Sequence, residues 1–535
     1  MAPSHPLDIP EILARIGFFL PLWIDNINSK SEQRTRFEPK TLLTCASVSK
    51  IWRRVFLPLL WYRYDCILMK SVPQETVALN SPHFRVLQIF GNDATAFQCV
   101  DLVDLIIRGA PNQMLLGILA AARSSRTGAR AGAGCEGGIV LSPQQQLVRS
   151  NLYLQSLFWH GPSPQKSLDI NDFTGLKYIQ TLKLSNWLCS PETMIELLSL
   201  VAGTLRELKL DRINGLQPLQ PEDLDTFTER LSTLFAPQPD KDGGTNNNND
   251  NKLVLPRLTT LVSTCEKAVS LFLAELVKIC PRLMTLDVYL ADDNGTTRLA
   301  DNLRTHCPEL QELKLSPVVT FRRVDALIRQ SSTAGLRKLS VEVCGPDEDL
   351  IAAILQHAGT LEDLAIERSV GDMDICRYFG LLEECSSLES FSLSATAVTL
   401  DKEFLDTLKN NGGSGSGGGG GSSHGWKCRR RLRKLVLNPR LYHGGGGSGG
   451  GEQLKADKDL LKVMSDSVSA MGWYRPRPLD PQQHFRGRFI NHTMVRKTFE
   501  LVQGLEKLET LVLDMVVFRS SPTISPTGSS SRLQT

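Results

Sequence analysis

Apolar residues recur along this chain in a short phrase that returns at nearly constant intervals. The phrase has an aliphatic residue at its first, fourth and sixth positions, as in Leu310-x-x-Leu313-x-Leu315. Successive copies lie about 25 to 27 residues apart, with some longer gaps. Because side chains alternate between the two faces of a strand, each phrase predicts one short strand with its apolar side chains on one face. The central residues of these phrases are Leu157, Leu182, Leu208, Leu261, Leu286, Leu313, Leu339, Leu364, Phe391, Leu435 and Leu511.

A helical pattern follows the strand in several of these units. After Leu184, Ser190 and Pro191 provide a helix start, and apolar residues from Met194 to Val201 then recur at helical spacing. Strands that alternate with helices at this period predict parallel strands on one side and helices on the other. The leucine spacing and the period resemble the leucine-rich repeat. We therefore expect an α/β fold, a leucine-rich-repeat solenoid with a curved parallel sheet inside and helices outside, over residues 80–519.

Polar tracts interrupt this period. Stretches rich in Gly, Asn and Ser bury little apolar surface and are predicted to be disordered inserts, and the Ser- and Pro-rich residues 520–535 are predicted to be a disordered tail. The four inserts are 123–138, 237–251, 410–425 and 444–451. The basic run 427–434 either flanks a strand or is a nuclear localisation signal, and the phrase beginning at Leu432 favours the strand.

The N-terminal residues do not follow the repeat. Pro10 fits a helix start, and the apolar residues from Ile12 to Leu20 are spaced for one helix face that includes Phe19. A second apolar stripe runs from Leu42 to Trp52. A helical bundle of this size buries little surface by itself, so we expect a partner or the adjoining repeats to cover part of it.

These residues resemble the F-box family. The motif Ile-Pro-Glu-Ile at residues 9–12 is followed in order by Phe19-Leu20, by Val48-Ser49-Lys50 with Trp52, and by Leu60-Trp61. The resemblance covers residues 5–65, and with the repeats behind it the chain is similar to fungal F-box leucine-rich-repeat proteins. A polar insert, residues 21–40, is longer than the family's usual connection, although loop closure entropy rises only slowly with length.

The resemblance implies a substrate-recognition subunit of an SCF-type cullin-RING ubiquitin ligase. Its partners would be a Skp-type adaptor, a cullin scaffold and an unidentified protein substrate. The alternative is a repeat scaffold outside the ubiquitin system, in which the N-terminal helices only cap the solenoid. The residues expected to bind the adaptor, or to support those that do, are Leu7, Ile9, Pro10, Ile12, Leu13, Ile16, Leu43, Val48, Trp52 and Trp61.

The residues that flank the inward leucines in each phrase should line the concave face of the sheet. They carry both signs of charge, and Tyr289 is the best single anchor for a partner. An exposed strand face commonly carries such residues without a partner, so both interpretations stay open. The candidate substrate-binding residues are Lys183, Lys209, Asp211, Asp287, Tyr289, Lys314, Glu342 and Glu367.

Composition and charge limit the partners, the compartment and the chemistry that we expect. Sixty Lys and Arg against 57 Asp and Glu give a net charge of +3, which argues against a nucleic-acid or membrane partner. The absence of a long apolar run or a secretory start predicts a cytoplasmic or nuclear protein, or one found in both. Three cysteines precede repeat phrases at the same position, and each is predicted to be a small buried residue of its repeat. They are Cys280, Cys307 and Cys385. The histidines are scattered and form no metal or nucleophile motif, so no enzyme activity, cofactor or metal is expected. His306 and His357 lie at helix ends and are expected to cap a helix or to be exposed.

Overall fold

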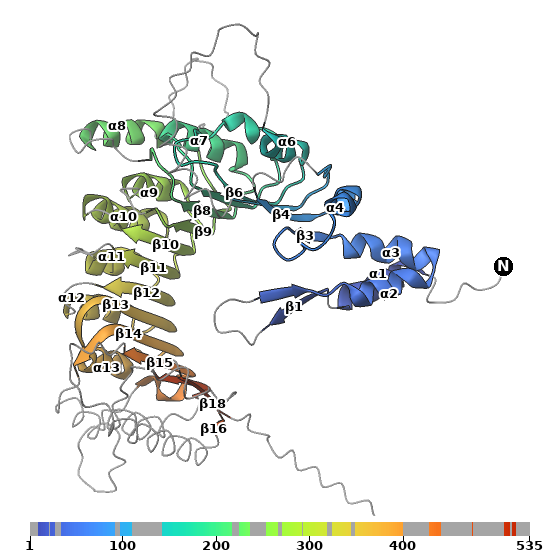
Figure 1. The fold of residues 1–535 in the computed structure, drawn as a ribbon. Helices are drawn as coiled ribbons and strands as arrows, with labels where there is room; N and C mark the ends of the chain where they lie inside the picture. The colour runs from blue at the N-terminus through green and yellow to red at the C-terminus, as the bar shows by residue number, and fades with distance from the viewer. Residues whose placement is uncertain are drawn as a thin grey trace, which may run out of the picture. The chain divides into compact units, whose positions relative to one another are not determined.

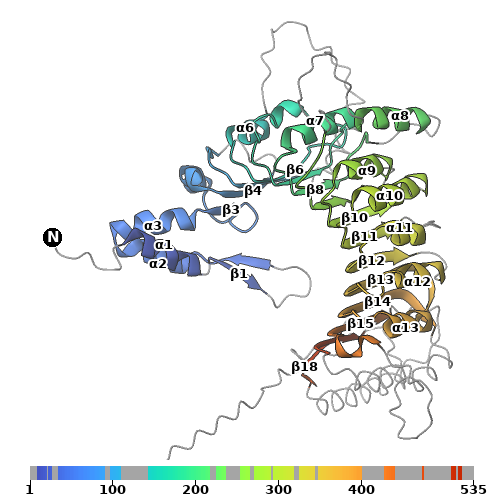
Figure 2. The same cartoon turned by 180° about the vertical axis from the view of Figure 1, so that it is seen from behind.

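The computed structural model places the chain in two compact units, Met1–Leu283 and Met284–Thr535. They are drawn in Figures 1 and 2 from opposite sides. The described residues are 9–20, 22–26, 34–90, 97–109, 142–216, 224–235, 253–265, 270–290, 293–317, 324–343, 348–399, 427–439, 473–474, 508–513 and 516–520. The four polar inserts and residues 521–535 lie outside them.

The first unit begins with three helices and a hairpin. Helix α1 starts at Pro10, as its sequence predicts, and Ser49 caps α3 by accepting a hydrogen bond from the backbone N–H of Trp52. Both α1 and α2 contact α3. The insert at 21–40 contains two antiparallel strands, so part of this polar segment is regular structure. The bounds are α1 (Pro10–Phe19), β1 (Trp23–Asn26), β2 (Arg34–Phe37), α2 (Lys40–Val48) and α3 (Lys50–Leu60).

A parallel sheet with strand order β3 to β9 makes up the rest of the first unit. Most of the labelled helices lie along one side of its strands (Figure 1). Its strands are β3 (Arg63–Asp65), β4 (Val86–Phe90), β5 (Asp104–Arg108), β6 (Ser156–His160), β7 (Thr181–Ser185), β8 (Glu207–Asp211) and β9 (Thr260–Ser263). Its helices are α4 (Gln74–Asn80), α6 (Pro143–Ser150), α7 (Pro191–Val201), α8 (Leu224–Phe235) and α9 (Ser270–Leu276).

The second unit repeats the same alternation. Strands β10 to β15 and β17 are parallel in chain order, and β18 and β16 then add to the edge in antiparallel orientation. The strands are β10 (Thr285–Leu290), β11 (Glu312–Pro317), β12 (Lys338–Val343), β13 (Asp363–Asp374), β14 (Ser390–Thr399), β15 (Lys434–Pro439), β16 (Trp473–Tyr474), β17 (Thr510–Leu513) and β18 (Val516–Ser520). The helices are α10 (Asp293–His306), α11 (Val324–Gln330), α12 (Glu348–Leu355) and α13 (Ile375–Glu384).

The leucines of the repeat phrases stand in register within each unit. Leu157 pairs with Leu182 and Leu182 with Leu208 in the first unit, and Leu286 pairs with Leu313 in the second. These leucines are almost fully buried, and such a side chain contributes about 1.5–3 kcal/mol when it leaves water. The predicted α/β class with a parallel sheet is therefore confirmed, and each unit is a stack of strand–helix repeats.

The cysteine prediction is also confirmed. Cys280, Cys307 and Cys385 are fully buried, each at the end of a helical segment before its repeat phrase. Burial raises the pKa of the Cys307 thiol to about 12 and that of Cys385 to about 11, so both are protonated at neutral pH. A fourth buried cysteine, Cys428, precedes the phrase of Leu432, and the basic run flanks β15 as the strand interpretation predicts.

Two parts of the fold differ from the sequence-based expectation. Strand β5 carries the same phrase, Leu102-x-x-Leu105-x-Ile107, which was missed because Leu105 lies only 18 residues after Leu87 and so falls outside the period. His357 is buried, not exposed, since it bonds the backbone of the repeat before it. Its Nδ1 accepts from the Leu336 N–H at 3.3 Å and its Nε2 donates to the Ile328 carbonyl at 2.8 Å, a tautomer that these partners require.

Candidate functional site

The N-terminal helices expose several of the residues expected to bind an adaptor. Pro10 is exposed, and Ile12, Leu43 and Val48 are exposed by 39, 49 and 61%. Exposed apolar side chains that gather on one small domain mark an interaction surface more often than a single exposed leucine does. These four residues are available to a partner.

The other members of that set have different positions. Leu13 and Trp61 are buried. Ile9, Ile16 and Trp52 are half-buried, and the ring of Trp52 lies 5.4 Å from that of Phe56. Leu7 lies outside the described residues.

Sequence reasoning missed three exposed apolar residues of these helices. Phe18 and Phe19 at the end of α1 are exposed by 71 and 87%, and Ile51 at the start of α3 by 41%. Phe19 was expected on one apolar face of α1 together with Leu13, but the close approach of Gly17 to Phe56 and Leu59 fixes which face of α1 meets α3 and leaves Phe19 outside it. The available signal was that α1 carries apolar residues on more than one face. We call the exposed apolar residues of α1, α2 and α3, which lie on more than one face of these helices, the helical apolar patch. They are Ile12, Phe18, Phe19, Leu43, Val48, Ile51 and Pro10.

The candidate substrate-binding residues of the first unit share one face of its sheet. Lys183 and Lys209 are register partners, and Asp211 lies two residues beyond Lys209 on the same strand. All three are half-exposed, while the alternate positions Leu208 and Leu210 are buried. The predicted alternation is therefore correct, and we call the face that carries these three residues the open face of this sheet.

The corresponding residues of the second unit also share one face. Asp287 is in register with Lys314, and their side chains form an ion pair at 3.0 Å. Tyr289 is half-exposed two residues after Asp287. Glu342 and Glu367 are register partners on β12 and β13, so two acidic residues stand side by side there. These five residues therefore lie on one face of the second unit's sheet, as their positions in the repeat phrases predict.

A polar cluster at the carboxyl ends of β6 to β9 was not foreseen, apart from Asp211. The hydroxyl of Ser185 donates to Asp211 Oδ2 at 2.7 Å and lies 3.2 Å from His160 Nδ1. Thr264 donates to Asp211 Oδ1 at 2.9 Å, and these hydrogen bonds outweigh desolvation and lower the pKa of Asp211. The pKa of His160 is lowered, chiefly by burial and then by the charge of Arg212. The sequence signal was available, because the same position after each strand phrase is polar in four successive repeats.

This cluster contains the residue types of a hydrolase triad but not its order. A catalytic histidine stands between serine and aspartate and takes the serine proton. Here Ser185 stands in the middle and donates its hydrogen bond directly to Asp211, and the residue is 1% exposed. The arrangement therefore ties neighbouring strands together and does not activate Ser185 as a nucleophile.

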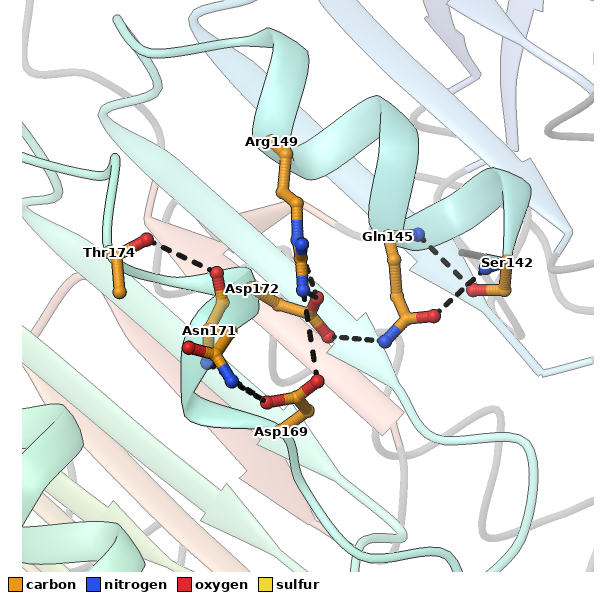
Figure 3. Close-up of polar contacts among 7 residues, drawn as sticks. All are labelled: Ser142, Gln145, Arg149, Asp169, Asn171, Asp172 and Thr174. Atoms are coloured by element: carbon orange, nitrogen blue, oxygen red, sulfur yellow. Dashed lines mark hydrogen bonds and ion pairs between the residues drawn. The ribbon is translucent and has the colours of Figure 1, made fainter. Parts of the chain in front are cut away.

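A second polar network fastens α6 to the segment before β7 (Figure 3). The buried carboxylate of Asp172 accepts from Arg149 Nε at 3.0 Å and Nη2 at 2.8 Å, and from Gln145 Nε2 at 2.9 Å. Gln145 also closes a capping box with Ser142 at the start of α6. The network joins α6 to residues 169–172, which lie between β6 and β7.

Comparisons with known proteins do not identify this chain. No protein-family model matches it, and a search of curated proteins finds no significant match. Within the described part of the chain, no group of three or more His, Cys, Asp or Glu side chains is placed to hold a metal ion. None of the described helices has the length and apolar character needed to cross a bilayer.

Proposed function

We propose that this chain is a substrate-recognition subunit of an SCF-type cullin-RING ubiquitin ligase, acting in the cytoplasm, the nucleus or both. Its N-terminal helices would form an F-box that docks a Skp-type adaptor, and its repeats would be leucine-rich repeats that hold a protein substrate. The observation that carries the proposal is the helical apolar patch, because it stands on a three-helix domain placed directly before a repeat sheet.

The exposure of these apolar side chains supports a docking role. Phe18, Phe19 and Val48 each expose more than half of their surface. Burying one such side chain in a partner contributes about 1.5–3 kcal/mol before the costs of association. A few anchors of this kind usually provide most of the affinity of a protein interface. On this proposal the chain performs no chemistry and raises the local concentration of a bound substrate near the ubiquitin-charged enzyme.

A second candidate function is a repeat scaffold whose N-terminal helices act only as a cap. Trp61 at the end of α3 is buried, with its ring 6.2 Å from that of Phe84. The Tyr62 carbonyl accepts hydrogen bonds from the N–H groups of Arg85 and Val86 at the start of β4. These contacts join the helices to the first strands, as a cap requires. They leave the helical apolar patch exposed, which is why we favour docking.

The test measures binding of purified Skp adaptor to the full chain by calorimetry. Val48→Asp places a charge in the patch and should weaken binding by about tenfold to a hundredfold. The matched control is Leu79→Asp, because Leu79 is 80% exposed on α4, outside the N-terminal helices. Both variants should melt at the temperature of the unchanged protein, since both positions are solvent-exposed. Absence of adaptor binding by the unchanged chain favours the cap, and equal binding by Val48→Asp contradicts the proposed docking surface.

A further inference from the structure

One row of side chains crosses the open face of the first unit's sheet. Ile106, Phe158, Lys183, Lys209 and Val262 are successive register partners on β5 to β9. All five are half-exposed, while the residues before and after each of them on its strand are buried. The row therefore points away from the core, and its order along the sheet is two apolar residues, two lysines and a valine.

The two lysines carry like charges on neighbouring strands. Lys209 Nζ forms an ion pair with Glu207 at 2.6 Å. Lys183 has no carboxylate within ion-pair distance among the described residues, and burial together with the charge of Lys209 lowers its pKa against the opposing attraction of Glu207, which both lysines share. Like charges held side by side destabilise a sheet, so one positive charge in this group is left without compensation. An added anion would supply that compensation.

The apolar half of the row favours an apolar contact instead of an anion. Phe158 lies next to Lys183 in the register, and Ile106 lies next to Phe158. Two large apolar side chains on the open face gain free energy when a further apolar side chain covers them. An apolar contact and an anion site thus lie on adjacent strands of one rigid sheet.

We propose that this row binds an extended peptide segment of a protein partner in which an apolar side chain and an Asp or Glu are two residues apart. The spacing follows from sheet geometry. Neighbouring strands are about 4.8 Å apart, so the midpoint between Lys183 and Lys209 lies roughly 7 Å from Phe158 along the row. Two residues of extended peptide span about the same distance, roughly 6.6 Å. The inference deepens the proposed function, and rests on it in treating the peptide as part of the substrate.

The charge balance selects a carboxylate over a phosphate. Lys183, Lys209 and Glu207 together carry one net positive charge, which one carboxylate neutralises, and Asp211 on the same face is already balanced by its ion pair with Arg212. A phosphate at neutral pH carries nearly two negative charges and would leave the group negative. Lysines also meet an anion as point charges and lack the fork geometry with which arginine holds phosphate.

The test uses an array of nonapeptides that share randomised flanks and differ at the central positions. The full chain, without adaptor, is bound to sets containing Phe-x-Asp, Phe-x-Asn, Ala-x-Asp and Phe-x-phosphoserine. We expect the Phe-x-Asp set to bind about tenfold more tightly than the Phe-x-Asn set, and this preference to weaken as salt rises. The Ala-x-Asp set should also bind more weakly than the Phe-x-Asp set, because it lacks the apolar contact.

Substitutions in the row test which side chains cause each peptide preference. Lys183→Gln with Lys209→Gln should abolish the preference for Asp over Asn, whereas Lys177→Gln, an exposed lysine before β7, should keep it. Phe158→Ser should abolish the preference for Phe over Ala and keep that for Asp. An unchanged preference in the double variant, tighter binding of phosphoserine than of Asp, or no peptide binding at all overturns the inference. Adaptor affinity is measured separately on the same proteins and should not change, so failure of this inference and failure of the proposed function are distinguishable.

Discussion

The buried ion pair between Arg149 and Asp172 should make a measurable contribution to the stability of the first unit. The perturbation is a double-mutant cycle of Arg149→Ala, Asp172→Ala and the two together. Both substitutions remove atoms of the network in Figure 3 and leave the main chain of α6 and of 170–173 unchanged. The cycle isolates the pairwise coupling from the effect of each side chain on its other neighbours.

The expected loss of stability in each variant follows from the burial of the pair and from the number of its hydrogen bonds. The Asp172 side chain is 2% exposed and that of Arg149 33% exposed. Breaking a fully buried pair costs about 3–5 kcal/mol, and a hydrogen bond to a charged group contributes about 1.5–3 kcal/mol. Because water reaches one third of Arg149, we expect about 2–3 kcal/mol for each single variant. The expected coupling energy is about 1–2 kcal/mol.

The assay is hydrogen exchange of the full chain under conditions where exchange reports the opening free energy. Peptides that cover α6 and residues 170–176 are compared with peptides from the second unit, which serve as an internal control. A coupling energy below about 0.5 kcal/mol would refute the reasoning, because two hydrogen bonds from one guanidinium to an oxygen of a buried carboxylate should not behave like a surface ion pair.

Two further predictions concern buried polar side chains. Burial lowers the pKa of His357 below its unfolded value of about 6.5, so its neutral form stabilises the fold fully above that pH and progressively less below it. The free energy of unfolding in urea should fall between pH 7.5 and 5, and His357→Gln should make it depend less steeply on pH. An unchanged pH dependence in the variant contradicts this prediction. Asn151 is fully buried, donates to the carbonyls of Cys99 and Leu147, and accepts from the Leu102 N–H. Asn151→Ala should destabilise the first unit by about 2–4 kcal/mol in the same exchange assay, and a loss below 1 kcal/mol contradicts it.

The repeat phrases predicted the sheet well because leucine burial and strand register have the same cause. Each phrase buries its leucines only when it lies beside the phrase of the next repeat, so Leu182 and Leu208 had to become neighbours. The same regularity predicts that Lys183, Lys209 and Asp211 share one face. Strand β5 was missed although it carries the same phrase, Leu102-x-x-Leu105-x-Ile107, because Leu105 lies only 18 residues after Leu87 and the search relied on a period of about 26.

The N-terminal helices were predicted less completely. Helix starts at Pro10 and Ser49 follow from local chemistry, but the face of α1 that meets α3 does not. Apolar residues occur on more than one face of α1, and packing around Gly17 decided that Leu13 is buried and Phe19 is exposed. Periodicity alone cannot make that choice, because both arrangements bury an apolar stripe.

The sequence by itself determined the α/β repeat class, the positions of most strands and the face on which each strand residue lies, because these depend on periods of two residues and of about twenty-six. The tertiary structure decided which polar side chains meet. Ser185 joins Asp211 and His160, and Asp172 meets Arg149, through contacts between residues more than twenty positions apart. The physical reason is that hydrogen bonds need atoms within about 3 Å, and only the stacking of one repeat on the next sets such distances.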